Sequence, residues 1–159
     1  MTTSNRNDNI LSNIGGVMSD EMAALVADVY ELAGLLRRSG EAIAAHEGQT
    51  QARWQFLSVI SDEPLTVPQA ARRLGVTRQA VQRVANELVD DQLVELGSNP
   101  DHRTSPLCRL TGDGRRILAR INKIAEVENS RVAQTVGVDV LRAADRGVRS
   151  VTSALRGQR

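Results

Sequence analysis

Five polar side chains between residues 78 and 86 carry hydrogen-bonding groups suited to nucleic acid. They are two guanidinium groups and three amides: Arg78, Gln79, Gln82, Arg83 and Asn86. Such groups can reach phosphate oxygens and base edges in a major groove. Apolar residues lie among them at three- and four-residue spacing: Val81, Val84, Ala85 and Leu88. This spacing predicts a helix that buries the apolar stripe and presents the polar side chains outward.

The residues just before this stretch predict a shorter helix and a tight turn. Small and apolar residues share one face of that helix: Ala70, Ala71 and Leu74. Gly75 suits the left-handed backbone of a sharp helix exit. Val76 is expected to fill the angle between the helices, and Thr77 to cap the second helix. The spacing of the small residue, the turn glycine and the inward Val81 is that of a helix-turn-helix.

An ordinary pair of antiparallel helices is the alternative, because it also needs a turn glycine and inward valines. Charge favours the helix-turn-helix a little: four arginines and no acidic residue lie between Pro64 and Asn86, in a chain whose net charge is only +1. That small net charge excludes a globally basic coat, so any attraction to DNA must come from local clustering. The stretch that follows the second helix decides between the two interpretations.

That stretch predicts a β-hairpin with a long tip. Residues 93–96 and 107–110 are β-compatible, and the loop between them contains glycine and proline. A hairpin directly after a helix-turn-helix is a wing. Arg103 near its tip is the kind of side chain that enters a narrow minor groove. A solvated loop charge is the alternative, and the preceding pair of helices favours the groove contact.

Helices are expected on both sides of this winged region. Residues 1–18 are expected to form a flexible arm, residues 19–47 a dimerisation helix, residues 48–112 the DNA-binding domain and residues 113–159 the C-terminal helices that complete the dimerisation domain. The 19–47 helix carries a long apolar stripe: Met22, Leu25, Val26, Val29, Leu32, Leu36 and Ile43. One small core cannot cover so much apolar surface, so we expect the same helix of a second subunit to cover it. The fold class is therefore mainly α with a small β-hairpin wing.

Composition sets further limits on a chain of 159 residues. Aromatic residues make up 2% of it, so Leu, Val, Ile and Ala must build the core. A single cysteine, Cys108, excludes an internal disulfide and suits a reducing cytoplasm. No signal peptide and no apolar run long enough to span a bilayer is present, so we expect a cytoplasmic protein with no membrane partner.

With these elements in order, the chain resembles the MarR family of winged-helix transcriptional regulators over roughly residues 19–155. Three stretches carry the resemblance: TVPQAARRLGVTRQAVQRVANELVDDQLVEL, PDHR at the wing tip and LTGDG at the start of the next helix. The family's Asp-x-Arg and Leu-Thr-x-x-Gly motifs fall here on Asp101, Arg103, Leu110, Thr111 and Gly114. The resemblance implies a homodimer whose two winged domains straddle a pseudo-palindromic duplex. It implies that Arg103 lies in the minor groove, with Asp101 orienting either Arg103 or the wing loop. It also implies that the major groove is contacted by Thr77, Arg78, Gln79, Gln82 and Arg83.

Two positions depart from the family pattern. Many members have glycine where this chain has Gln92, so the exit of the second helix must be closed differently. His102 stands where a second arginine is common, which replaces a permanent charge with one that titrates near neutral pH. We therefore expect weaker and pH-sensitive binding by the wing.

Other sites have less support. Family members often bind a small anionic or phenolic effector between the dimer helices and the winged domain, and the candidates here are His46, Arg53 and Trp54. The alternative is that Trp54 belongs to the core and the other two to the surface. Cys108 is expected to be a small buried hydrophobe rather than a sensor. No ligand-like spacing predicts a metal, no cofactor is expected, and no phosphate loop or catalytic triad indicates an enzyme.

The sequence thus favours a homodimeric, sequence-specific regulator that binds double-stranded DNA, with repression relieved by a ligand. A winged-helix module that assembles proteins without specific DNA binding is the alternative. The two differ in what removal of Arg78, Arg83 or Arg103 would do, since only a DNA reader would lose affinity for its operator.

Overall fold

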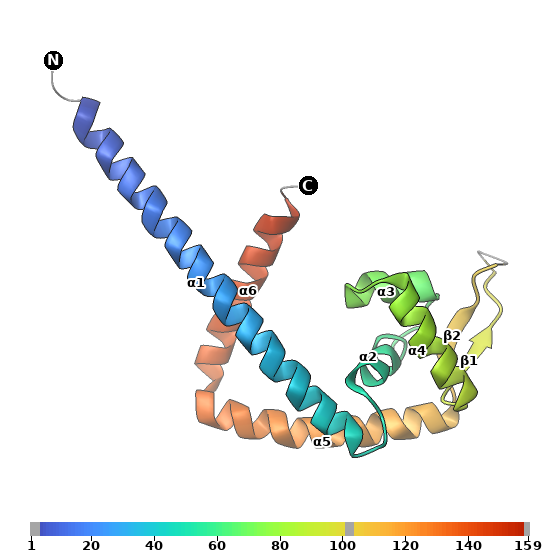
Figure 1. The fold of residues 1–159 in the computed structure, drawn as a ribbon. Coiled ribbons are helices and arrows are strands. Elements are labelled where there is room, and N and C mark those ends of the chain that lie inside the picture. The colour runs from blue at the N-terminus through green and yellow to red at the C-terminus, as the bar shows by residue number, and fades with distance from the viewer. Residues whose placement is uncertain (1–3, 101–103, 158–159) are drawn as a thin grey trace. The chain divides into compact units, whose positions relative to one another are not determined.

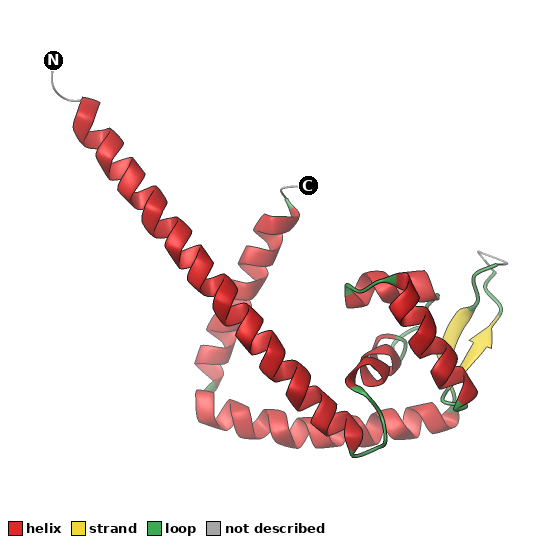
Figure 2. Cartoon of the chain, viewed as in Figure 1, coloured by secondary structure: helices red, strands yellow, loops and turns green. Residues whose placement is uncertain are grey.

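The computed structural model describes residues 4–100 and 104–157. Helices dominate it, and a two-stranded sheet follows the fourth helix (Figures 1 and 2). The elements are α1 (Ser4–Ala45), α2 (Gln51–Val59), α3 (Val67–Leu74), α4 (Arg78–Asp90), β1 (Val94–Gly97), β2 (Leu107–Leu110), α5 (Gly112–Val136) and α6 (Val138–Arg156). The predicted class, mainly α with a small hairpin, is confirmed.

The chain divides into two compact units, Met1–Ala42 and Ile43–Arg159. The first consists of α1 without its last turn. This helix begins at Ser4 and continues through Gly15 and Gly16, whereas the sequence predicted a flexible arm over residues 1–18 and a helix that begins at residue 19. Glycine lowers helix propensity by about 1 kcal/mol relative to alanine but keeps its N–H, so it weakens a helix without ending it. The division of the chain into arm, dimerisation helices and DNA-binding domain stays a prediction.

The second unit has two clusters of buried apolar side chains. The larger one joins α2, α3, α4, the sheet and the start of α5, with Phe56, Leu57 and Leu88 nearly inaccessible to solvent. The smaller one consists of Ile43, Ile121 and Ala125. Trp54 and Ile117 pack against both clusters and so tie the helix-turn-helix to α5.

Threonine side chains cap four helices, among them α4, whose cap at Thr77 was predicted. Each hydroxyl oxygen accepts the N–H group three residues later, at 3.0–3.4 Å: Thr50 for α2, Thr66 for α3, Thr77 for α4 and Thr111 for α5. Gln69 completes a capping box, because its side chain accepts the N–H of Thr66 at 2.8 Å. These caps define where each short helix of the second unit begins.

The turn between α3 and α4 has the left-handed glycine that was predicted, with Gly75 at φ 68°. The expectation for Val76 was wrong in part: its side chain is 48% exposed and does not fill the angle between the helices. It lies instead at a small apolar concavity of about 90 Å³, which Leu74, Val81 and Val84 also line. The larger Phe56 and the inward valines of α4 occupy the interior.

The exit of α4 is closed by a left-handed residue that is not glycine. Gln92 has φ 60°, its N–H donates to the carbonyl of Val89 at 2.9 Å, and the N–H of Leu93 donates to that of Leu88 at 2.9 Å. This pair of bonds is a Schellman motif, with Leu93 and Leu88 both buried as its apolar contact. Thr111 adds a further closure, because its hydroxyl donates to the carbonyl of Gln92 at 2.8 Å. The missing glycine is thus compensated by hydrogen bonds.

Strands β1 and β2 pair antiparallel with Val94 opposite Leu110 and Leu96 opposite Cys108. Val94, Cys108 and Leu110 point into the core, which places Arg109 and Glu95 on the exposed face. Leu65 pairs with Cys108 through two backbone hydrogen bonds and holds the hairpin against the start of α3. The hairpin is therefore a wing anchored on the helix-turn-helix.

Candidate nucleic-acid interface

The polar face of α4 is exposed as the sequence predicts. All six residues expected to face DNA are exposed: Thr77, Arg78, Gln79, Gln82, Arg83 and Asn86. The stripe on the other side of the helix is buried: Val81, Val84, Ala85 and Leu88. One helix therefore carries a fixed apolar face and an open polar face. Whether these residues contact DNA stays a prediction.

Several of these side chains already have partners within the protein. The Gln82 amide donates to Asn86 Oδ1 at 2.9 Å, which leaves the Gln82 carbonyl oxygen and the Asn86 amide group available for other partners. Arg83 lies 3.7 Å from the carboxylate of Glu87, a weak exposed pair. Within the described residues Arg78 makes no hydrogen bond or ion pair. Arg78 is thus the least committed cation on this helix.

Three wing residues that were expected at the DNA interface lie outside the described residues: Asp101, His102 and Arg103. On either side of them, the Asn99 amide donates to the carbonyl of Ser105 at 2.8 Å and closes the base of the tip.

Arg109 is a residue on the wing that the sequence analysis missed. Its Nε would be 3.0 Å from a Cβ atom built on Gly97, so the exposed guanidinium stem lies across this glycine rather than over Glu95, its register partner. Strand alternation could have found it, because Cys108 and Leu110 point inward and Arg109 must point outward. Arg109 places a cation on the outer face of the wing.

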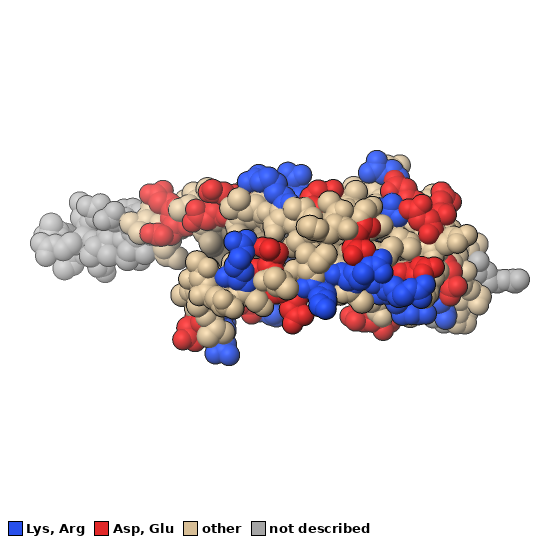
Figure 3. Space-filling view, turned by 90° about the horizontal axis from the view of Figure 1, so that it is seen from below, with Lys and Arg blue, Asp and Glu red and all other residues tan. Residues whose placement is uncertain are grey.

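On the face turned to the viewer in Figure 3, Lys and Arg atoms are interspersed with Asp and Glu atoms. Arg73 pairs with Glu63 and Arg116 with Asp113, so both charges are partly neutralised. These two paired cations would therefore add little to the attraction for a polyanion.

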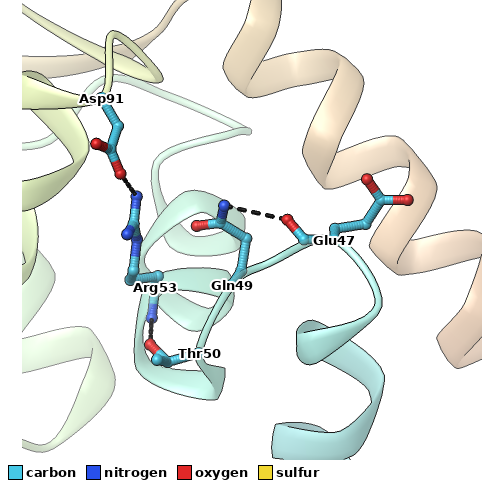
Figure 4. Close-up of polar contacts among 5 residues, drawn as sticks. All are labelled: Glu47, Gln49, Thr50, Arg53 and Asp91. Carbon is cyan, nitrogen blue, oxygen red and sulfur yellow. Dashed lines mark hydrogen bonds and ion pairs between the residues drawn. The ribbon is translucent and has the colours of Figure 1, made fainter.

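The three predicted effector residues have different surroundings. Arg53 of α2 pairs with Asp91 at the end of α4, and its N–H donates to the capping Thr50 at 3.3 Å (Figure 4). Trp54 points to α5, where its indole N–H donates to Asn122 Oδ1 at 2.9 Å. His46 is exposed in the turn after α1. An effector site built from these residues stays a prediction.

Trp54 does line a shallow, open concavity of about 500 Å³. The other lining residues all belong to α5: Asn122, Ala125, Glu126, Asn129, Ser130 and Ala133. An aromatic ring beside amide and hydroxyl groups could take a flat polar ligand, but neither Arg53 nor His46 supplies a charge there.

Cys108 is buried, and burial raises the pKa of its thiol to about 11. A protonated, inaccessible thiol is a poor nucleophile and a poor metal ligand. Among the described residues no group of three His, Cys, Asp or Glu side chains could hold a metal ion. No helix in the described part of the chain is long and apolar enough to cross a membrane.

A helix-turn-helix with an exposed polar second helix, followed by an anchored hairpin, defines a winged helix-turn-helix protein. Comparison with known proteins makes the assignment specific. A profile described as MarR family matches residues 42–103. The uncharacterized protein Rv2011c of Mycobacterium tuberculosis is 63% identical over 142 residues, which are 89% of this chain and 99% of that one.

Solved structures share the fold. The crystal structure of the MarR family transcription regulator SP03579 matches with a TM-score of 0.79 and 22% identity, over 90% of this chain and 95% of that one. A mutant MarR from E. coli complexed with operator DNA matches with a TM-score of 0.74 and 19% identity, over 83% and 96%. The chain belongs to the MarR family of transcriptional regulators, and it is a regulator rather than an enzyme.

Proposed function

We propose that this protein is a homodimeric repressor that binds a pseudo-palindromic site in double-stranded DNA, with α4 as its recognition helix. The observation that carries the proposal is the two-sided character of α4, with its buried valine stripe and its exposed arginines and amides. Arg78 lies in the first turn, next to the capping Thr77, at the end of the helix that would enter the major groove, where its guanidinium can reach base edges. The C-terminal end of α4 is acidic and would be repelled by DNA phosphates, so the N-terminal half of the helix would enter the groove.

The wing is the second contact in this proposal. Arg103, with Asp101 and His102 beside it, would enter the minor groove, and Arg109 would meet the phosphate backbone from the outer face of the hairpin.

Exposed apolar surface supports the dimer. Along α1, large apolar side chains are exposed at helical spacing: Met22, Leu25, Val26, Val29, Leu32 and Leu36. Leu141, Val148 and Leu155 on α6 are exposed in the same way. A second copy of the chain is the natural cover, and it would place two recognition helices about one DNA turn apart, roughly 34 Å.

Relief of repression by a small anionic or phenolic effector is the regulatory part of the proposal, with His46, Arg53 and Trp54 as candidate contacts. Such a ligand would act by changing the separation of the two recognition helices. The protein would work in the cytoplasm, where its DNA lies.

The test is fluorescence anisotropy of the purified chain against a duplex selected from a random pool and a scrambled duplex of equal composition, across a salt series. We expect tight, salt-dependent binding to the first and much weaker binding to the second. Arg78→Ala should weaken binding to the selected duplex while the urea unfolding curve stays unchanged. Failure of selection to enrich any sequence would favour a winged module that assembles proteins instead.

A further inference from the structure

We propose that Arg53 is a positioning residue for the recognition helix. Arg53 acts through Asp91 and itself makes no contact with DNA. The inference rests on the proposed DNA-binding function and concerns how one end of α4 is held. It gives Arg53 a second role, beside the effector contact proposed for it above.

The contact joins two elements that the chain keeps far apart. Arg53 lies in the first turn of α2, where its N–H is bound by the capping Thr50, and its guanidinium pairs with the carboxylate of Asp91 (Figure 4). Asp91 is the C-cap residue of α4, immediately before the left-handed Gln92. A cation at this place also complements the negative end of the helix dipole.

The pair is asymmetric in its exposure. The Arg53 side chain is 15% exposed and the Asp91 side chain 55%. Arg53 Nε is buried and has no hydrogen-bond partner. Within the described part of the chain, Asp91 is the partner on which the guanidinium depends. Loss of that carboxylate would leave the charge of the buried Arg53 guanidinium poorly compensated. The end of α4 would then move away from α2 and admit water, which solvates this charge.

Movement at this end of α4 reaches the other end. Core packing holds α4 as far as Leu88 and Val89, and Asp91 lies on the exposed side of the turn between these residues and the buried Leu93. The helix has 13 residues and is therefore about 20 Å long, so a tilt at Asp91 displaces Arg78 in the opposite sense. Specific binding needs base-reading groups held within a fraction of an ångström, whereas non-specific attraction to phosphates does not.

A simpler electrostatic role for Asp91 makes the opposite prediction. If its carboxylate only repelled DNA, Asp91→Asn would remove a negative charge and tighten binding to every duplex. A positioning role predicts that Asp91→Asn weakens binding to the selected duplex alone. The direction in which Asp91→Asn changes the affinity for the selected duplex therefore distinguishes the electrostatic role from the positioning role.

The experiment compares the full-length protein with Asp91→Asn on the selected and scrambled duplexes across a salt series. We expect roughly tenfold weaker binding to the selected duplex, an unchanged affinity for the scrambled one and an unchanged salt slope. Asp91→Glu should restore most of the loss, because it keeps the carboxylate. Glu47→Gln is the matched control: it also replaces an acid by its amide and breaks an ion pair, the 2.7 Å contact with Arg120, but this pair joins α5 to the turn after α1 and includes no residue of α4.

Unchanged or tighter binding by Asp91→Asn overturns the inference, as does an equal loss in Glu47→Gln. If Asp91→Asn does not fold, Arg53→Met takes its place, since it leaves only a half-exposed carboxylate unpaired. It should show the same loss of specificity, and normal specificity in this variant overturns the inference. If the wild-type protein does not distinguish the two duplexes, the proposed function itself is overturned. If the wild type and Asp91→Asn distinguish them equally well, the proposed function stands and only the inference about Arg53 is overturned.

Discussion

Gly114 faces the carbonyl oxygen of Leu93 so closely that a Cβ atom on Gly114 would lie 2.1 Å from that oxygen. The same carbonyl accepts the N–H of Thr111 at 3.1 Å. The first turn of α5 thus rests directly on the turn that ends α4. This contact gives the glycine of the Leu-Thr-x-x-Gly pattern a physical reason: no other residue leaves room for the backbone.

Gly114→Ala should therefore lower the free energy of unfolding, on the order of 3 kcal/mol, because a backbone oxygen cannot yield as a flexible side chain can. Gly112→Ala is the matched control two residues away, since its Cβ would meet only the end of Arg116 at 3.6 Å. Urea unfolding of both variants measures the difference. Equal stability of the two would contradict the close approach.

Gln92→Gly should raise the free energy of unfolding by about 1 kcal/mol. A residue with a Cβ atom is strained at φ 60°, and glycine removes that strain while the backbone bonds to Val89 and Thr111 remain. Gln92→Ala is the control, which should change little because it keeps the Cβ atom. A Gly variant no more stable than the Ala variant would argue against a left-handed Gln92.

The buried thiol predicts a loss of stability in alkali. The pKa of Cys108 is raised by burial from 9.0 to about 11, so above pH 9 the unfolded chain releases a proton that the folded protein retains. The free energy of unfolding should fall between pH 9 and pH 11, by roughly 2 kcal/mol at pH 11. Urea unfolding of wild type and Cys108→Ala at pH 8 and pH 11 isolates the contribution of this thiol to the loss of stability. Parallel behaviour of the two proteins would refute it, and rapid labelling of the folded protein by a thiol reagent would refute the burial.

Arg109→Ala should weaken binding to selected and scrambled duplexes alike and reduce the salt slope by about one, as expected for a phosphate contact. Arg78→Ala should instead lower the preference for the selected duplex. Arg131→Ala, on α5 and paired with Glu128 at 2.8 Å, is a control for the loss of one surface charge. If Arg109→Ala changes only the sequence preference, the residue reads bases and not phosphate.

His102 predicts pH-dependent binding. A histidine in place of an arginine carries its charge at low pH only, so DNA binding should be tighter at pH 6 than at pH 8. The comparison is made with wild type and His102→Arg, whose affinity should not change over this range. An unchanged DNA affinity of the wild type between pH 6 and pH 8 would refute the hypothesis.

The sequence by itself determined the order and kind of the elements in the winged region. A threonine cap, a turn glycine and apolar spacing act over a few residues, so Thr77, Gly75 and the buried stripe of α4 could be located without tertiary structure. The same local rules failed at the start of α1, because a glycine pair lowers helix propensity but does not prevent a helix.

Only the tertiary structure decided which distant groups meet. The pairing of Arg53 with Asp91, the docking of Gly114 on Leu93 and the closure of Gln92 by Thr111 all join residues from different elements. None of them follows from residue spacing, since each depends on how helices and strands pack in three dimensions around a shared core. Local hydrogen bonding and periodicity are written along the chain, whereas the partners of a buried charge or a close backbone approach exist only once the core has formed.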